Sequence, residues 1–154
     1  MNITMIGAGY VGLVSGACFA DFGHNVVCVD LDARKVDALR SGVMPIYEPG
    51  LEALVRTNAE ANRLSFSTDL AASVADADAV FIAVGTPSRR GDGHADLSYV
   101  YQATRDIAAA VTKPTVVVTK STVPVGTGDE VERILREVAP SGEWAVVSNP
   151  EFLR

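Results

Sequence analysis

The chain has 154 residues, of which 48% are hydrophobic, and it carries a formal net charge of −6. This length and hydrophobic content supply one well-packed core and leave too little for two ordinary domains, so we expect a single domain. The negative charge disfavours nucleic acid or an anionic membrane as a partner, because both need clustered lysine and arginine. A bound anion would therefore have to be held by local geometry.

Compartment and metal binding can also be judged from composition. No apolar run approaches the ~20 residues of a membrane span, and no charged-then-apolar leader precedes Asn2. Cys18 and Cys28 show neither a disulfide framework nor metal-ligand spacing, which is typical of a reducing compartment. We expect a cytosolic protein in which both cysteines are small buried apolar residues, with His24 and His94 at the surface or in turns.

The first predicted elements are a strand over residues 2–6, a glycine-rich turn and a helix that ends at about Asp21. The turn, over residues 7–12, has the pattern G-x-G-x-x-G. We expect Gly7 to make the tight turn, Gly9 to leave room for a pyrophosphate, and Gly12 to let the helix approach the sheet. The phosphates would then meet free N–H groups at the helix N-terminus.

A second predicted strand, over residues 25–29, ends in the carboxylate of Asp30, 18 residues after the last glycine of the turn. An acid about 20 residues after the turn is typical of a dinucleotide site, where it accepts hydrogen bonds from the adenosine ribose. It would repel a 2′-phosphate and so favour NAD over NADP, a preference that Arg34 and Lys35 weaken. In the alternative interpretation, Asp30 only caps the helix that follows, over residues 31–40.

The rest of the chain continues the alternation of helices and strands. We predict helices over about 50–61, 69–74, 97–111 and 126–138 and strands over 64–67, 79–84, 115–119 and 144–148, with Thr68 or Asp69 capping the short helix. Six strands with this spacing predict an α/β fold: a Rossmann-type doubly wound parallel six-stranded sheet in a single domain.

The stretch over residues 45–50 has two interpretations. In the first interpretation the stretch is a structural connector, because its prolines fix the backbone and Glu48 could cap the helix that begins near Gly50. A role over the cofactor or at an interface with a substrate domain is the other.

Ligands of such sheets lie beyond the carboxyl ends of the strands. Polar or glycine-rich segments follow five of the predicted strands: residues 7–12, Asp30, 85–88, 120–124 and 149–151. Each segment taken alone is also compatible with an ordinary turn. Together they predict one continuous site.

Five segments together resemble the UDP-glucose/GDP-mannose dehydrogenase family, specifically its N-terminal NAD-binding domain. They occur in the family's order and approximate spacing, and all except the first are distinctive: residues 7–13, 45–51, 84–87, 120–126 and 149–154. The resemblance covers the whole chain but about the first third of a family member. It implies that a central helix, a nucleotide-sugar domain and a catalytic cysteine lie outside these residues.

The resemblance implies a four-electron oxidation of a sugar C6 alcohol to a carboxylate, with two NAD and a covalent thioester. Residues 43–47 and 120–124 favour UDP-glucose, oxidised to UDP-glucuronate, over GDP-mannose as the substrate. We expect the isolated chain to be inactive, because it lacks the nucleophile, and the full-length protein to be a homo-oligomer. A stand-alone NAD-binding or redox-sensing module remains the alternative from another class.

The family pattern also implies roles for individual residues. Tyr10 and Val11 would lie against the pyrophosphate, and Asp30 and Lys35 at the adenosine ribose. The nicotinamide end would be lined by Val84, Thr86 and Pro87, with Ser121 and Thr122 reaching the nicotinamide ribose and a catalytic water.

Glu151 is the residue to which the resemblance assigns chemistry. In the family, this acid assists proton movement at the thioester stage and the attack of water on the thioester. The pattern places Glu151, Phe152, Leu153 and Arg154 in the segment that holds the UDP-sugar. The alternative for Glu151 is a loop acid in solvent. The segment over residues 149–154 favours the dehydrogenase over a stand-alone sensor, because a sensor would have no need of an acid beside the nicotinamide pocket.

Overall fold

The computed structural model describes residues 1–89, 91 and 93–151. Its strands are β1 (Asn2–Ile6), β2 (Asn25–Val29), β3 (Leu64–Ser67), β4 (Ala79–Ile82), β5 (Thr115–Thr119) and β6 (Trp144–Ser148). Its helices are α1 (Tyr10–Asp21), α2 (Ala33–Arg40), α3 (Leu51–Glu60), α4 (Leu70–Val74), α5 (Ser98–Ala110) and α6 (Thr127–Val138). These bounds lie within about two residues of the predicted ones.

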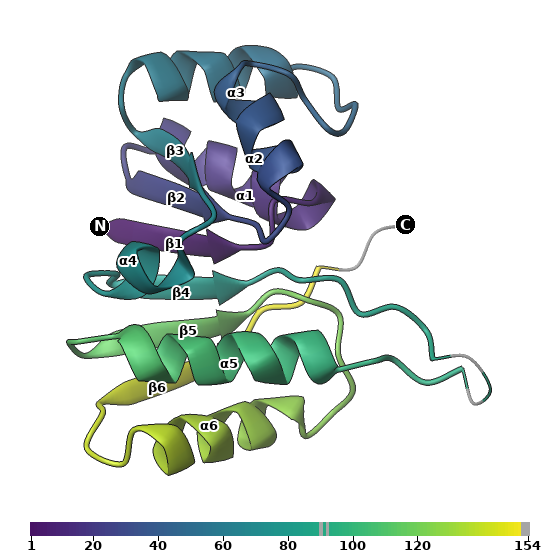
Figure 1. Cartoon of the computed structure of the whole chain (residues 1–154), viewed down its shortest axis with the longest axis vertical. Coiled ribbons are helices and arrows are strands. Elements are labelled where there is room, and N and C mark those ends of the chain that lie inside the picture. The colour runs from purple at the N-terminus through teal and green to yellow at the C-terminus, as the bar shows by residue number, and fades with distance from the viewer. Residues whose placement is uncertain (90, 92, 152–154) are drawn as a thin grey trace.

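All strands pair in parallel in one six-stranded sheet with the order β3-β2-β1-β4-β5-β6. The strand order reverses between β1 and β4, which confirms the predicted doubly wound α/β fold. All carboxyl ends of the strands point to one edge of the molecule, at the right of Figure 1. The long connection between β4 and α5 starts at the same edge, so the predicted site segments share one side of the fold.

The two faces of the sheet carry separate hydrophobic clusters, because successive side chains of a strand point to opposite faces. Met5 and Cys28 pack with α1, α2 and α3 on one face. Ile6 and Val80 pack with α4, α5 and α6 on the other. Each face of the sheet is thus covered by its own three helices.

The helix caps exclude the capping roles that the sequence left open for two acids, Asp30 and Glu48. Asp32, not Asp30, caps α2, because its side chain accepts a hydrogen bond from the backbone N–H of Arg34. Glu48 does not cap α3, whose N-cap is Gly50 without a side-chain hydrogen bond. The predicted cap of the short helix α4 is confirmed at Asp69, which accepts from the N–H of Ala72.

The cysteine and histidine expectations were only partly right. Cys28 is fully buried, as expected, whereas Cys18 is only half-buried. His94 is exposed, and His24 is half-buried with its ring 6.5 Å from that of Phe19. Within the described ranges, no helix is long and apolar enough to cross a membrane.

Candidate cofactor site

The three glycines after β1 meet three different constraints. Gly7 has a φ of 103°, and a Cβ there would lie 2.5 Å from the carbonyl oxygen of Ala83. A Cβ on Gly12 would lie 1.8 Å from the carbonyl oxygen of Gly7, so α1 can approach the turn only with glycine at this position. A Cβ on Gly9 would meet nothing within 4 Å. The need for glycine at Gly9 is therefore not set by packing, and Gly9 faces an open pocket.

The N-terminus of α1 opens beside this turn. Gly9 is its N-cap, and no side chain caps the first turn of the helix. The N–H groups at the start of a helix lack intrahelical partners and attract anions. The turn and the helix start can therefore receive a diphosphate without any clustered positive charge.

Asp30, immediately after β2, holds the turn in place. Its carboxylate accepts from the backbone N–H of Ala8 at 3.0 Å and of Asp32 at 3.0 Å, and Lys35 Nζ lies 2.6 Å away. Burial raises the pKa of Asp30, but the hydrogen bonds from Lys35 and the two N–H groups outweigh it, and the net pKa is lowered. The carboxylate is thus ionised at neutral pH and still 13% exposed, which leaves it able to accept from a ribose hydroxyl.

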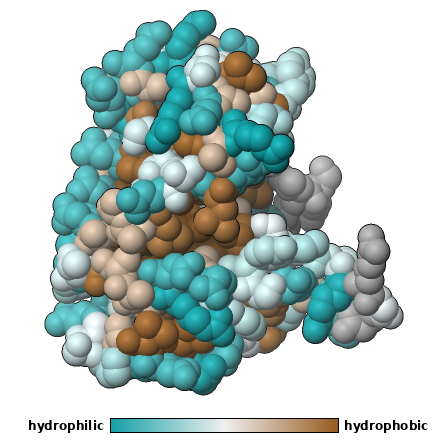
Figure 2. Space-filling view, in the orientation of Figure 1, coloured by the Kyte–Doolittle hydropathy of each residue, from teal (hydrophilic) through white to brown (hydrophobic). Residues whose placement is uncertain are grey.

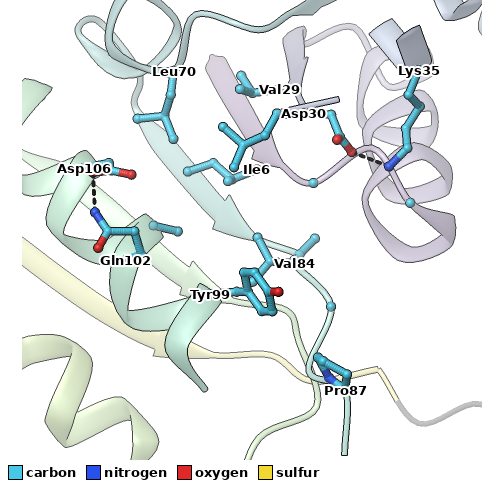
Figure 3. A pocket seen from close by; sticks show the side chains of 16 residues that line it. Ile6, Val29, Asp30, Lys35, Leu70, Val84, Pro87, Tyr99, Gln102 and Asp106 are labelled. Atoms are coloured by element: carbon cyan, nitrogen blue, oxygen red, sulfur yellow. Dashed lines mark hydrogen bonds and ion pairs between the residues drawn. The ribbon is translucent and has the colours of Figure 1, made fainter. Parts of the chain in front are cut away.

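A pocket of about 590 Å³ lies beside these residues. Figure 3 shows Asp30 and Lys35 at one end, Gln102 and Asp106 at the other, and Ile6, Val29 and Leu70 between them. Figure 2 shows hydrophobic residues gathered between the two halves of the molecule, where the pocket opens. The size and the mostly apolar lining are typical of small-ligand sites. Six predicted cofactor residues line this pocket: Gly7, Gly9, Asp30, Lys35, Val84 and Pro87.

A second cluster joins the ends of β4, β5 and β6. The hydroxyl of Thr86 donates to the backbone carbonyl oxygen of Thr122 at 3.2 Å. The hydroxyl of Thr122 donates to the backbone carbonyl oxygen of Glu151 at 3.0 Å. Ser121 is 5% exposed, and its hydroxyl donates to the carbonyl oxygen of Val84 at 2.7 Å. The structure thus brings three residues predicted at the nicotinamide end together with Glu151, and none of these four lines the pocket: Thr86, Ser121, Thr122 and Glu151.

Lys120 reaches the carboxylate of this second cluster. Its Nζ lies 3.6 Å from Glu151 Oε2 and 3.3 Å from Asn149 Oδ1. The Lys120 side chain is 16% exposed and that of Glu151 is 29% exposed. Glu151 is therefore a partly buried acid beside a cation rather than a freely solvated loop residue.

Tyr10 bonds to the loop over residues 45–50 rather than pointing into the pocket. Its hydroxyl donates to the carboxylate of Glu48. This hydrogen bond, with smaller contributions from burial and from the negative charges of Glu48 and Glu151, raises the pKa of Tyr10. The loop is thus fastened to the first residue of α1, and neither Tyr10 nor Val11 lines the pocket.

Several lining residues were missed by the sequence analysis. Four lie on α5, namely Tyr99, Gln102, Ala103 and Asp106. Their spacing of three, one and three residues places them on one face of a helix, but such spacing does not by itself identify a site. Leu70 on α4 carried no comparable signal. Phe152, Leu153 and Arg154, predicted to hold the sugar, lie outside the described residues.

Taken together, a doubly wound parallel sheet, a glycine turn that opens a helix and an acid at the end of β2 define a Rossmann-type dinucleotide-binding domain. The family model described as "UDP-glucose/GDP-mannose dehydrogenase family, NAD binding domain" matches residues 1–154, so the chain belongs to this family. NAD is its cofactor, and the open position at Gly9, the free helix start and the ionised Asp30 fit that molecule.

Curated relatives agree with this assignment. The chain is 70% identical to a UDP-glucose 6-dehydrogenase of Rhizobium meliloti (strain 1021), over the whole chain and 35% of that protein. It is 52% identical to UDP-glucose 6-dehydrogenase YwqF of Bacillus subtilis (strain 168), again over the whole chain and 35% of the relative. The chain therefore spans about a third of the length of these relatives.

Solved structures show the same fold. A GDP-mannose dehydrogenase from Pseudomonas aeruginosa, determined as a ternary complex, has a TM-score of 0.94 and 39% identity, over the whole chain and 37% of that structure. A UDP-glucose dehydrogenase from the hyperthermophilic archaeon Pyrobaculum islandicum has a TM-score of 0.92 and 45% identity, over 99% of the chain and 36% of that structure. The fold of this domain is thus shared by enzymes whose names give different nucleotide sugars.

Proposed function

We propose that this chain is the NAD-binding part of a UDP-glucose 6-dehydrogenase, which oxidises the C6 alcohol of UDP-glucose to UDP-glucuronate in two NAD-dependent steps. The observation that carries the choice of substrate is the 70% identity, over the whole chain, to a UDP-glucose 6-dehydrogenase. Similarity of fold alone does not favour UDP-glucose, since a GDP-mannose dehydrogenase matches with a TM-score of 0.94.

The adenosine half of NAD would bind between the glycine turn and Asp30. The free N–H groups around Tyr10, Val11 and Gly12 would receive the pyrophosphate. Asp30 would accept from the ribose hydroxyls, and Lys35, 2.6 Å from that carboxylate, would both orient it and donate to the ribose. An ionised acid at this place repels a 2′-phosphate, which supports NAD over NADP.

The nicotinamide half would lie toward the second cluster. NAD, when bound there, supplies the hydride acceptor. Val84 and Pro87 would form an apolar wall beside the nicotinamide. Thr86 and Ser121 would position its ribose. Thr122 would orient a water molecule, since a hydroxyl both donates and accepts hydrogen bonds. Glu151 would accept and return a proton close to the reacting carbon, at the strand edge where Lys120 and Thr122 hold it.

The covalent step in this family requires a thiolate, and the two cysteines of the chain are poorly placed to supply one. Cys28 is fully buried within β2, and burial raises the pKa of its thiol to about 12. Cys18 lies within α1, away from the strand ends that carry the site. We therefore assign the nucleophile to another part of the protein and expect these 154 residues alone not to oxidise UDP-glucose.

Calorimetric titration of the chain with NAD and NADP tests the cofactor assignment. We expect NAD to bind at least about tenfold more tightly, because the NADP phosphate meets the Asp30 carboxylate. Tighter binding of NADP would contradict the role of Asp30. A chain that binds NAD and also converts UDP-glucose to UDP-glucuronate would contradict the assignment of the nucleophile.

The role of Glu151 is tested in the full-length protein. We expect Glu151→Gln to leave NAD binding nearly unchanged and to slow the step after aldehyde formation, so that the first NADH per active site forms faster than the second. Rapid mixing with UDP-glucose, followed by NADH absorbance, separates the two phases. Equal slowing of both phases, or none, would remove the role assigned to Glu151. If the full-length wild type formed no NADH from UDP-glucose, a stand-alone NAD-binding module would be the better interpretation.

A further inference from the structure

The pocket has a polar end that the glycine turn and Asp30 do not explain. At this end, Gln102 and Asp106 project from α5, across the pocket from Asp30 and Lys35 (Figure 3). Gln102 Nε2 donates to Asp106 Oδ1 at 2.9 Å. The lining between the two ends is apolar, so these two side chains are the chief polar groups that a ligand would meet there.

The position of this end relative to Asp30 identifies the part of NAD that would reach it. With the pyrophosphate at the glycine turn and the ribose at Asp30, the adenine ring leaves the ribose on the side away from the phosphates. That side is the apolar slot lined by Ile6, Val29 and Leu70, which suits the flat faces of a base. The outer edge of the base would then face α5.

The hydrogen bond between the two residues fixes which atoms they offer to a ligand. An ionised carboxylate only accepts, so the amide nitrogen of Gln102 must face Asp106 and the amide oxygen must face elsewhere. This leaves Gln102 Oε1 and Asp106 Oδ2 as acceptors, and neither is bonded to any residue in the described part of the chain. The polar end of the pocket therefore presents two acceptors.

We propose that Gln102 and Asp106 recognise the amino edge of the adenine ring and make the pocket specific for an adenine dinucleotide. The proposal rests on the proposed binding of NAD at Asp30. Adenine carries an N6 amino group with two N–H donors, whereas hypoxanthine and guanine carry an acceptor oxygen at the same position. In the free chain Gln102 is exposed and Asp106 is half-buried, and a bound base would cover both of them. Two acceptors that face the oxygen of hypoxanthine or guanine would then lose water without gaining a donor, which lowers affinity.

A purely structural explanation makes a different prediction. A Gln–Asp pair at i and i+4 stabilises a helix by about 0.2–0.5 kcal/mol wherever it lies. Glu132 and Arg136 form an i,i+4 pair on α6 with a separation of 2.5 Å, and neither lines the pocket. This pair provides a matched control, since its loss would change helix stability but not recognition of the base.

The test compares NAD with nicotinamide hypoxanthine dinucleotide, in which only the amino group of adenine is replaced. Dissociation constants are measured calorimetrically for the wild-type chain, Asp106→Asn, Gln102→Met and the control Glu132→Gln. We expect the wild type and the control to prefer NAD by about tenfold or more, and both pocket variants to lower the preference below about threefold, mainly through weaker NAD binding. Thermal melting of each variant verifies that it is folded.

Two other outcomes overturn the proposal and are distinguishable. Equal affinity of the wild type for both dinucleotides, or an unchanged preference in the two pocket variants, removes base recognition at this edge while the proposed function stands. Absence of NAD binding by the wild type removes the proposed function as well.

Discussion

Gly9 and Gly12 lie within one turn of the same helix start, yet an added methyl group would meet opposite surroundings at the two positions. At Gly9 it would meet no atom within 4 Å, and at Gly12 it would lie 1.8 Å from the carbonyl oxygen of Gly7. Gly9 therefore leaves open the space that a ligand would occupy, and Gly12 allows α1 to pack closely on the turn.

This difference predicts that two alanine substitutions separate binding from stability. Gly9→Ala should cost about 1 kcal/mol of stability at most, as for an alanine N-cap, and weaken NAD binding at least about tenfold. Gly12→Ala should cost about 3 kcal/mol or more, because a backbone oxygen must move, and lower Tm by about 6 °C or more. Thermal melting and NAD titration of both variants check this. A Gly9→Ala chain that binds NAD normally would contradict the assignment of the pyrophosphate to this turn.

The lowered pKa of Asp30 predicts how its contribution to stability depends on pH. The folded protein favours the ionised form, so the stabilisation is complete above the usual aspartate value of 3.8 and is lost as pH falls through the lower, folded-state value. Denaturant unfolding of wild type and Asp30→Asn at a series of pH values should show a difference at pH 6 that shrinks below about pH 4. Asp37→Asn is the control, since Asp37 is an exposed acid on α2. A pH-independent difference would argue against the ionised network.

The sequence predicted the parts of the site that are set by local chain order. The turn at Gly7 and the acid at Asp30 follow from a strand, a glycine pattern, a helix and a second strand, so neighbouring residues determine them. Tertiary partners decided the rest. Glu48 has the right position for a helix cap, but the hydroxyl of Tyr10, 38 residues away, takes its carboxylate. Propensity cannot anticipate a partner that distant.

The α5 end of the pocket is also determined by tertiary packing rather than by local sequence. Gln102 and Asp106 have the spacing of an ordinary exposed helix pair, and only the packing of α5 beside β4 turns that face toward Asp30. The sheet order β2-β1-β4 brings Asp30 and Gln102 to the same pocket, although they lie 72 positions apart in the chain. The Asp30 end of the pocket could therefore be predicted from the sequence, and the α5 end could not.

The burial of Cys28 predicts chemical protection. Its thiol is fully buried, and burial raises its pKa to about 12, so almost none of it is the reactive thiolate at pH 8. Brief treatment of the native chain with iodoacetamide at pH 8 should leave Cys28 unmodified, whereas treatment in denaturant should modify both cysteines. Peptide mass spectrometry measures the two sites separately, with half-buried Cys18 as the internal reference. Rapid modification of Cys28 in the native chain would show that β2 opens readily.

Two threonines of β5 should respond in opposite directions to the same substitution. Thr119 is 1% exposed, and its hydroxyl has no hydrogen-bond partner among the described residues. Thr115 is 3% exposed, and its hydroxyl lies 3.0 Å from the carbonyl oxygens of Ala77 and Lys113. A buried hydroxyl without a partner costs about 1–3 kcal/mol, whereas a satisfied one contributes about 1 kcal/mol.

Valine has the shape of threonine without the hydroxyl, so the replacement isolates that group. Thr119→Val should raise the free energy of unfolding by about 1 kcal/mol and Tm by about 2–4 °C, and Thr115→Val should lower both by similar amounts. Calorimetric melting of the two variants in parallel measures the contrast, because both positions share a strand and the same preference for β-branched residues. Destabilisation by both substitutions would contradict this prediction and would mean that the Thr119 hydroxyl finds a hydrogen-bond partner in solution.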